Sequence, residues 1–397
     1  MDGFQETRIR FMDIELSVVM PCLNEEGTIA DCIAKALNAF EQMGISGEVV
    51  VVDNGSTDSS VEIAKNAGAR IVIESVRGYG QALKRGFEEA YGKYIIMGDA
   101  DSTYDFSEIK EFVRLLREGA DLVMGSRLKG NIYPKAMPWL HRWVGTPALT
   151  KVINLFFNVR ISDVNCGLRG FKKESIRKLD LKCRGMEFAS EMVAKAGQKK
   201  LNIKEIPISY HATPPGRTPS LRTFADGWRH LRFMLMFSPR YLFLLPGLII
   251  FLFGLLFTTV LFLKESIVIF NIPLGVSTAI FANACLLTGL QVMLFGVYAI
   301  ILNSSQGLIE RDRISDFFEK NFTLERGLVI GAVILGVGII MGITTIVLIF
   351  KLTGDFSEIH VSLTKLAAVS IFIVLLGIQM IFSSFYISLF STTKTLK

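Results

Sequence analysis

Short apolar runs alternate with longer amphipathic stretches through the first half of the chain. The runs indicate buried strands, because they are roughly four to eight residues long and end at turn residues. They lie at residues 14–20, 48–52, 70–73, 94–97, 121–124 and 203–210. Between them, apolar residues recur at helical spacing, which predicts helices at residues 28–43, 59–67, 80–91, 107–118 and 187–196.

This alternation predicts an α/β fold with a mostly parallel sheet covered by helices on both faces. Ligands bind such sheets at the carboxyl ends of the strands. Asn24, Asp53 and Asp99 each follow a predicted strand, so we expect them at one edge of the sheet. Residues 135–160 are rich in aromatic and basic groups and are expected to lie along a membrane.

The second half of the chain contains four charge-free stretches long enough to cross a bilayer core, which takes roughly 20 residues. They predict transmembrane helices at about residues 241–263, 274–302, 327–350 and 366–389. The alternative, buried helices of a large soluble domain, fits such long apolar segments poorly. The predicted organisation is a tail (1–13), an α/β domain (14–222), an amphipathic interfacial helix (223–240) and a transmembrane domain (241–397).

Composition supports a membrane protein in a reducing compartment. Half of the residues are hydrophobic (50%), and the mean hydropathy is +0.42. The first 15 residues mix charges without the apolar core of a secretory signal, and the 5 cysteines form no Cys-x-x-Cys pair. An odd number of cysteines without metal spacing suits free thiols.

Charge placement predicts the topology. The net charge is +6, and five arginines precede the first span: Arg217, Arg222, Arg229, Arg232 and Arg240. Basic residues beside a span stay cytoplasmic and attract anionic lipids. We therefore expect a multi-pass cell-membrane protein with its α/β domain and both termini cytoplasmic. A nucleic-acid partner is not expected, because the charge gathers at a membrane junction.

The most informative motif is Asp99-Ala-Asp101, two carboxylates directly after a buried strand. Such a pair can hold a divalent cation through hard oxygen ligands, and that cation can neutralise the diphosphate of a nucleotide sugar. Taken alone the motif is weak, because Asp-x-Asp is also common in turns. A hard ion that keeps several waters suits Mg²⁺ or Mn²⁺.

Further motifs occur in a consistent order along the chain. They are residues 21–25 (PCLNE), 51–58 (VVDNGSTD), 78–82 (GYGQA), 98–101 (GDAD), 125–127 (GSR) and 163–169 (DVNCGLR). This series resembles the family 2 glycosyltransferases of the GT-A fold, and more narrowly the polyprenyl- or dolichyl-phosphate hexose synthases. The resemblance covers about residues 14–235. It implies a Rossmann-like catalytic domain followed here by a four-helix transmembrane region.

The resemblance implies a donor site. Pro21, Leu23 and Glu25 would line the nucleoside pocket, and Asp53 would bind the base or ribose. Asp53 also stands in a strong turn sequence, Asp-Asn-Gly-Ser, so a turn cap is the alternative.

The remaining donor residues belong to two motifs. Gly78 and Gly80 would let the backbone approach the ligand, unless they only form a loop before a helix. Asp99 and Asp101 would contact nucleotide and metal, with Asp101 the more direct ligand. Relatives often carry Gln where this chain has Thr103, so water or phosphate would complete the metal shell.

The resemblance also implies an acceptor site. Arg127 and Arg169 would hold the acceptor phosphate, because the guanidinium fork matches phosphate oxygens. The alternative is that either arginine pairs with a carboxylate of the fold. Asp163 would be the catalytic base or organiser. A lipid monophosphate is largely anionic at neutral pH, so we expect Asp163 to orient groups, with Arg169 as one candidate partner, more than to remove a proton.

The function implied is inverting transfer of one hexose, from UDP-glucose or GDP-mannose, to a polyprenyl or dolichyl phosphate at the cytoplasmic face. A processive polysaccharide synthase is the first alternative, but Gly227-Trp228-Arg229 does not match its usual Gln-x-x-Arg-Trp motif. A transporter or flippase with a nucleotide-binding domain is the second, and it predicts ionisable residues inside the spans, which the charge-free stretches lack. The sequence leaves the oligomeric state open, a homo-oligomer included.

Overall fold

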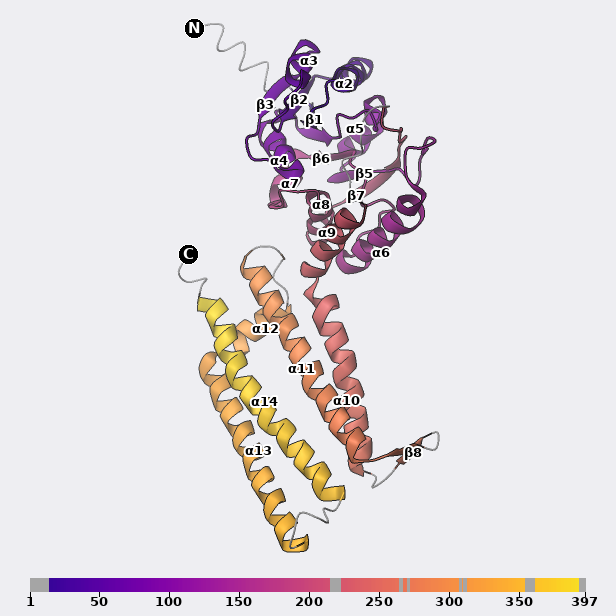
Figure 1. The fold of residues 1–397 in the computed structure, drawn as a ribbon. Coiled ribbons are helices and arrows are strands. Elements are labelled where there is room, and N and C mark those ends of the chain that lie inside the picture. The colour runs from indigo at the N-terminus through magenta and orange to yellow at the C-terminus, as the bar shows by residue number, and fades with distance from the viewer. Residues whose placement is uncertain are drawn as a thin grey trace. The chain divides into compact units, whose positions relative to one another are not determined.

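The computed structural model describes residues 14–214, 223–263, 267–269, 272–306, 309, 313–353 and 361–392. The predicted tail and two of the five arginines, Arg217 and Arg222, lie outside these residues. The chain divides into two compact units, Met1–Met234 and Leu235–Lys397, and each is described by itself (Figure 1).

The first unit is built on a 7-stranded sheet with the order β3-β2-β1-β4-β6-β5-β7. Strand β6 runs antiparallel to both of its neighbours, and the other pairs are parallel. The predicted α/β fold is thus confirmed. The strands are β1 (Leu16–Cys22), β2 (Gly47–Asp53), β3 (Arg70–Ile73), β4 (Tyr94–Met97), β5 (Leu122–Ser126), β6 (Arg169–Lys172) and β7 (Ile203–Pro207).

Strand β6 is the strand that the apolar pattern did not predict. It is four residues long and carries Arg169 and Lys172 at its ends, so it has neither an apolar run nor a regular alternation. Arg169 pairs in register with Met97 of β4 and Met124 of β5, which places it inside the sheet.

Helices cover both faces of this sheet, as the alternation predicted. On one face, the buried residues of α2 and α5 join those of β1 and β2 in one core cluster. On the other face, Phe87 of α4 packs against Phe171 of β6 and Phe188 of α8, with ring centroids 4.8 and 6.0 Å apart.

The helices of the first unit, including short turns, follow the chain in this order: α2 (Ile29–Met43), α3 (Ser60–Asn66), α4 (Tyr79–Glu89), η1 (Phe106–Ile109), α5 (Lys110–Arg117), η2 (His141–Gly145), α6 (Thr146–Phe157), α7 (Lys173–Lys178), α8 (Phe188–Gln198) and α9 (Thr223–Met236). Helix α9 reaches the boundary between the units. It is anchored within the first unit by His230, whose Nδ1 lies 2.8 Å from the Ser190 hydroxyl.

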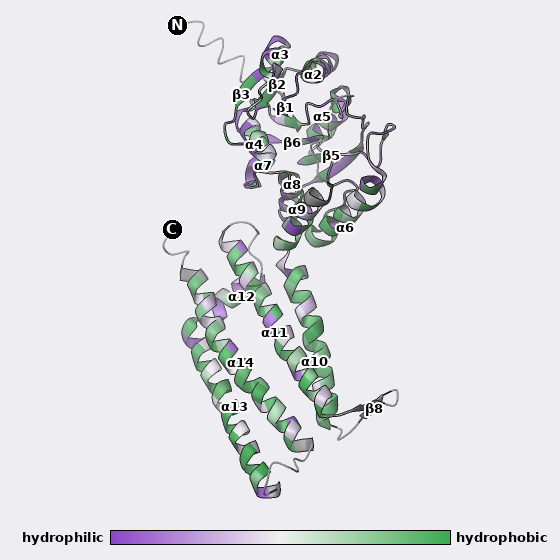
Figure 2. Ribbon diagram, in the orientation of Figure 1, coloured by the Kyte–Doolittle hydropathy of each residue, from purple (hydrophilic) through white to green (hydrophobic). Residues whose placement is uncertain are grey.

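The second unit contains four helices long and apolar enough to cross a membrane, among the described residues. Figure 2 shows them as mostly hydrophobic ribbons. The candidate spans are Arg240–Leu263, Val276–Ser305, Leu324–Lys351 and Leu363–Leu389. The elements are η3 (Arg240–Leu244), α10 (Leu245–Leu263), β8 (Ile267–Ile269), β9 (Ile272–Leu274), α11 (Val276–Ser305), α12 (Arg313–Asn321), α13 (Leu324–Thr353) and α14 (Val361–Thr392).

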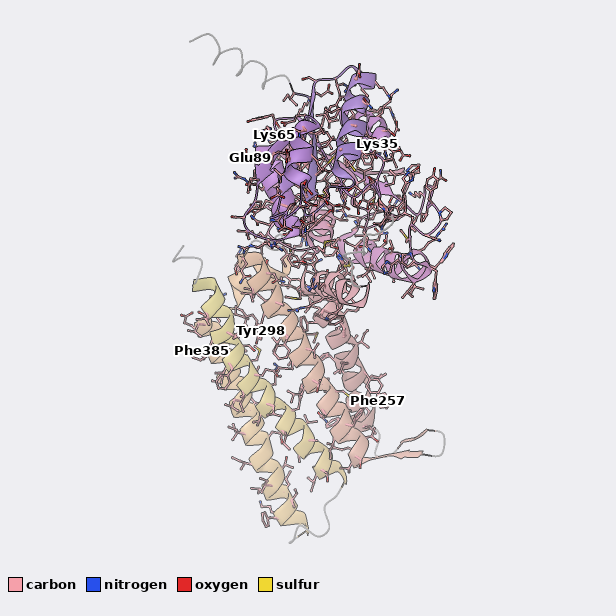
Figure 3. The ribbon with its side chains drawn as sticks, turned by 45° about the horizontal axis from the view of Figure 1, so that its top comes forward. Lys35, Lys65, Glu89, Phe257, Tyr298 and Phe385 are labelled. Atoms are coloured by element: carbon pink, nitrogen blue, oxygen red, sulfur yellow. The ribbon has the colours of Figure 1, made fainter. Side chains whose placement is uncertain are left out.

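Polar side chains join α11 to α14 inside the second unit. The Tyr298 hydroxyl donates to the Ser383 hydroxyl at 2.6 Å, and Gln379 donates to Gln291. Tyr298 on α11 and Phe385 on α14 are labelled in Figure 3. Hydrogen bonds of this kind add to the packing between neighbouring apolar helices and favour one pairing of them.

The spans were predicted to contain no ionisable residues, but the fourth candidate span contains Lys365. The sequence placed the fourth span at 366–389, just after this lysine, but helix α14 begins at Val361 and the apolar segment includes Lys365. Its side chain is buried, and its ammonium donates to the Leu261 carbonyl at 2.7 Å. A cation at the last turn of α10 complements the negative end of the helix dipole.

Candidate active site

The carboxyl ends of three neighbouring strands meet at one edge of the sheet. Strands β2, β1 and β4 are adjacent and parallel, so Asp53 at the end of β2 and Asn24 and Asp99 after β1 and β4 lie at the same edge, as predicted. Asn24 ties two of the loops together, because its Oδ1 accepts the Thr57 N–H at 2.8 Å. The site is thus built from loops that the sheet brings together.

Asp53 caps the turn that follows β2. Its two carboxylate oxygens accept the N–H groups of Gly55 and Ser56 at 3.2 and 3.1 Å, and the side chain is buried. This is the turn arrangement that the Asp-Asn-Gly-Ser sequence favours. A nucleoside contact for Asp53 remains a prediction.

The loop after β1 stands beside the Asp99–Asp101 loop. Thr28 connects the two, since its hydroxyl donates to the Ala100 carbonyl at 2.7 Å. Pro21, near the end of β1, and Glu25, in the loop, are half-buried, whereas Leu23 is exposed. The three residues predicted to line a nucleoside pocket therefore lie next to the predicted metal ligands.

Asp99 is held between two residues that the sequence analysis did not single out for it. The Tyr79 hydroxyl donates to its Oδ1 at 2.9 Å. On the other side, a Cβ added to Gly167 would lie 2.8 Å from its Oδ2, so a larger residue there would displace the Asp99 carboxylate. Burial and then the neighbouring charge of Asp101 raise the pKa of Asp99 to about 7, against the lowering effect of the Tyr79 hydrogen bond.

Asp101 is oriented by Thr103, the residue found where relatives often have glutamine. One oxygen, Oδ1, accepts both the Thr103 N–H at 3.0 Å and its hydroxyl at 2.5 Å. The described residues contain no cluster of three or more metal-binding side chains. Asp99 and Asp101 still have carboxylate oxygens that could bind a cation. Such a pair fits a hard cation that takes its other ligands from phosphate and water.

Gly78 and Gly80 are closely approached by another segment of the protein. A Cβ on Gly80 would lie 2.7 Å from the Cys183 carbonyl oxygen, and one on Gly78 would clash with the Arg184 carbonyl. Gly78 also has a φ of +149° and donates its N–H to Asn54 at 2.8 Å. The glycines thus give room to the 183–184 backbone, and their predicted closeness to a ligand gains no support here.

Glu191 fixes that approaching segment. Its carboxylate accepts the Lys182 and Cys183 N–H groups at 2.9 and 2.8 Å, and it pairs with Lys195 at 2.8 Å. Glu191 and Lys195 are both buried. The ion pair therefore holds the 182–184 segment, which packs against Gly78 and Gly80 on either side of Tyr79 at the start of α4.

Arg127 and Asp163 form a buried two-pronged ion pair. Nε and Nη2 of Arg127 lie 2.7 and 2.9 Å from the two carboxylate oxygens, and Asp163 is fully buried. Burial acts to lower the pKa of Arg127, but the charge of Asp163 and other neighbours outweighs it and raises this pKa above its usual value. The guanidinium also lies over the Tyr210 ring, 5.0 Å from its centroid.

Arg169 is enclosed by main-chain carbonyls. The side chain is fully buried, and its guanidinium donates to the carbonyls of Cys166, Val164 and Ala189 at 2.8, 2.8 and 2.5 Å. The predicted pairing of Asp163 with Arg169 is not found, since Asp163 binds Arg127 instead. Arg169 therefore does not lie at an open site, and its predicted contact with the acceptor phosphate gains no support from this arrangement.

A cavity of about 370 Å³ is lined by Gly130, Asn131, Ile132, Tyr133, Pro134 and Arg142. Gly130 links it to the ion pair, because its N–H donates to the Arg127 carbonyl at 3.3 Å. The segment after β7 connects this cavity to the loop that carries Asp99 and Asp101. Tyr210 donates its N–H to Asn131 at 2.8 Å, and His211 donates its N–H to Thr103 at 2.9 Å. The cavity wall is therefore linked to the residue that orients Asp101.

The sequence analysis missed Tyr79, Tyr133, Arg142 and His211 as residues of the site. Tyr79 stands between two glycines in a quoted motif, which was the available signal. Tyr133 and His211 stack with ring centroids 4.4 Å apart, although they are far apart in sequence. No local pattern marks such a pair.

The fold and the site together define an α/β enzyme domain with a paired-carboxylate site, carried on a membrane-spanning unit. Residues 17–180 match Glycosyl transferase family 2, and residues 297–391 match the Glycosyltransferase family 2 C-terminal transmembrane region.

Two relatives from Haloferax volcanii extend these matches. The low-salt glycan biosynthesis hexosyltransferase Agl6 is 42% identical over 374 residues, which cover 93% of this chain and 87% of the relative. A dolichyl-phosphate hexose transferase is 29% identical, over 54% of this chain and 89% of the relative. This chain belongs to glycosyltransferase family 2, which confirms the resemblance, and it is a membrane glycosyltransferase.

Solved structures similar to this chain include glucosyl-3-phosphoglycerate synthase from Mycobacterium tuberculosis. Its complex with phosphoglyceric acid has a TM-score of 0.47 at 21% identity, over 58% of this chain and 82% of that chain. Its complex with Mn²⁺, uridine diphosphate and glucosyl-3-phosphoglycerate has a TM-score of 0.45 at 21% identity, with the same coverage.

Proposed function

We propose that this enzyme transfers one hexose from a nucleotide sugar, UDP-glucose or GDP-mannose, to a polyprenyl or dolichyl phosphate at the cytoplasmic face of the membrane. The observation that carries the proposal is the pair Asp99 and Asp101 at the carboxyl edge of the sheet, linked through Thr103 and His211 to a cavity lined by Arg142. The names of the two Haloferax relatives support hexose transfer, and one of them supports a lipid phosphate acceptor.

The donor would lie across the edge formed by β2, β1 and β4. Pro21, Leu23, Glu25 and Asp53 would face the nucleoside, and Asp99 and Asp101 would hold Mg²⁺ or Mn²⁺. When bound, this cation supplies positive charge to the leaving diphosphate. Asp101 keeps Oδ2 for that contact, because the Thr103 bonds occupy Oδ1.

The acceptor phosphate would enter the cavity beside Tyr133 and Arg142. Arg142 supplies a cation there, and Arg127 supplies a second one nearby that Asp163 holds in place. A phosphate oxygen attacks the anomeric carbon, the bond from that carbon to the diphosphate oxygen breaks, and the nucleoside diphosphate leaves with the electron pair. The attacking phosphate is already largely anionic at neutral pH, so Asp163 is needed to orient Arg127 and not to remove a proton.

The cytoplasmic placement rests on charge. The arginines before the first span and the charged segment between the second and third spans, which includes Arg313 and Lys320, would stay inside. Cysteine labelling of intact cells tests this in a background without native cysteines. A cysteine at Ser357, which lies outside the described residues, should react with an impermeant reagent. A cysteine at Asn321, an exposed position, should react only after permeabilisation; the reverse pattern would invert the topology.

The activity itself is tested with purified full-length protein in detergent. Radiolabelled UDP- and GDP-sugars are offered with polyprenyl phosphate, and lipid-linked sugar is measured by extraction. One hexose should appear per lipid. A ladder of longer products would instead indicate a processive synthase, and the absence of any lipid-linked sugar from the whole panel would refute the proposal.

A further inference from the structure

The loop from Asp163 to Arg169 connects the two halves of the proposed site. At one end Asp163 pairs with Arg127, on the acceptor side. At the other end Gly167 packs against Asp99, on the donor side, and donates its N–H to the Tyr104 hydroxyl at 2.7 Å. A hexose in transfer joins donor diphosphate to acceptor phosphate through one carbon atom, so a hexose that bridges the two halves of the proposed site would pass beside this loop.

The polar groups around this loop are almost all engaged within the protein. The Arg169 guanidinium donates to two main-chain carbonyls of the loop, those of Val164 and Cys166. The Val164 N–H donates to the Thr150 hydroxyl at 3.2 Å, and the Asp163 N–H donates to Glu205 at the same distance. The loop is therefore rigidly held, and few groups remain for a ligand.

Asn165 is the exception. Its N–H donates to Asp163 Oδ1 at 3.2 Å, but its carboxamide makes no hydrogen bond to any described residue. The side chain is half-buried, and Oδ1 is shielded from solvent without a protein partner. An unpaired buried oxygen costs free energy, and groups in this state in native proteins call for an explanation.

We propose that Asn165 determines sugar specificity by hydrogen-bonding a hydroxyl group of the transferred hexose; this inference rests on the proposed function. A carboxamide both donates and accepts, which matches a sugar hydroxyl in either role. A half-turn of the amide exchanges oxygen and nitrogen at almost no change in shape. A site that hydrogen-bonds a hydroxyl discriminates against sugars in which it is missing or inverted.

The test combines Asn165→Ala with deoxygenated donors, using the full-length enzyme in detergent. The donor is UDP-glucose or GDP-mannose, whichever the wild type uses, together with its 2-, 3-, 4- and 6-deoxy analogues. In the wild type, kcat/KM for one deoxy analogue should fall below that for the parent donor by about 2- to 10-fold more than it does in Asn165→Ala. The extra penalty is absent from the variant because the variant has already lost the contact. The other three penalties should be unchanged, and the apparent Tm should not fall.

Asn154→Ala is the matched control. The Asn154 carboxamide is committed to the fold, since it donates to the Ile161 carbonyl at 2.8 Å and accepts the Ile161 N–H at 3.2 Å. This variant should lower the apparent Tm and leave all four penalties as in the wild type. If Asn165→Ala behaves in the same way, Asn165 is structural and the proposal is overturned.

Failure of the proposed function would look different. If the wild type transfers no hexose to polyprenyl phosphate, calorimetry with Mn²⁺ still compares UDP-glucose with UDP, and GDP-mannose with GDP. The wild type should bind the nucleotide sugar more tightly than the nucleoside diphosphate alone. Asn165→Ala should reduce this difference in affinity without changing the affinity for the nucleoside diphosphate. An unchanged sugar contribution would overturn the assignment of Asn165.

Discussion

Asp163→Asn separates an organising role from a catalytic one. The substitution keeps the shape of the side chain but removes the charge that faces Arg127 across 2.7 and 2.9 Å. Asp163 is fully buried and Arg127 is 8% exposed, so solvent cannot replace the lost partner. The guanidinium would be left as an uncompensated buried charge.

The expected cost is large. Breaking a buried ion pair by removing one partner destabilises a protein by about 3–5 kcal/mol. For a domain of about 200 residues, each kcal/mol lowers the Tm by roughly 2–4 °C, so the fall should be about 6–20 °C. Glu111→Gln, in an exposed ion pair with Arg114, is the control and should leave the Tm nearly unchanged.

The assay is thermal unfolding of the full-length enzyme in detergent, followed with the activity measurement. The double variant Arg127→Met, Asp163→Leu should recover most of the lost Tm, because apolar side chains of similar volume often replace a buried ion pair without loss. Measured against the single variants Arg127→Met and Asp163→Leu, this recovery amounts to a coupling energy of at least about 2 kcal/mol between the two sites. Transfer activity should stay low in the double variant, since Arg127 is missing.

Two results would refute this reasoning. If the two single substitutions add in the double variant, the pair does not stabilise the fold as a unit. If Asp163→Asn keeps the wild-type Tm while kcat falls and the acidic limb of the pH–rate profile disappears, Asp163 acts as the catalytic base and not through Arg127.

Three further predictions concern the metal, the pH dependence and Arg169. EDTA should abolish transfer and Mg²⁺ or Mn²⁺ should restore it, and Asp101→Asn should lose most activity. Asp105→Asn, which removes a carboxylate from a similar turn at Ser107, should not; full activity in chelator would contradict a metal role. Because the pKa of Asp99 is raised to about 7, the neutral acid is favoured in the folded state, so metal-free stability should fall as pH rises from about 4 to 7. Mn²⁺ affinity should rise over the approach to pH 7 by up to about tenfold per unit, because binding releases the proton. Calorimetry would measure the affinity, and Asp99→Asn should abolish both trends. Arg169→Lys cannot reach all three carbonyls, so it should cost about 1–3 kcal/mol for each one left unpaired and leave the acceptor KM unchanged. A higher acceptor KM at an unchanged Tm would restore its predicted phosphate contact.

The sequence by itself determined the features that depend on local pattern. Alternating strands and helices gave the α/β sheet, and long charge-free stretches gave the membrane-spanning helices, because the spacing of apolar residues records which faces are buried. The order of Asp53 and Asp99 after parallel strands also predicted that their loops share one edge. These inferences needed no knowledge of distant contacts.

Tertiary structure alone decided which partners the charged groups have. Arg127 meets Asp163 from a loop 36 residues away, and Arg169 turns inward because β6 inserts between β4 and β5. Both arginines had been expected to bind phosphate, and sequence cannot tell such a role from an internal ion pair. A buried charge is stable only with a partner. That partner depends on which distant segments of the chain the fold packs together in the interior.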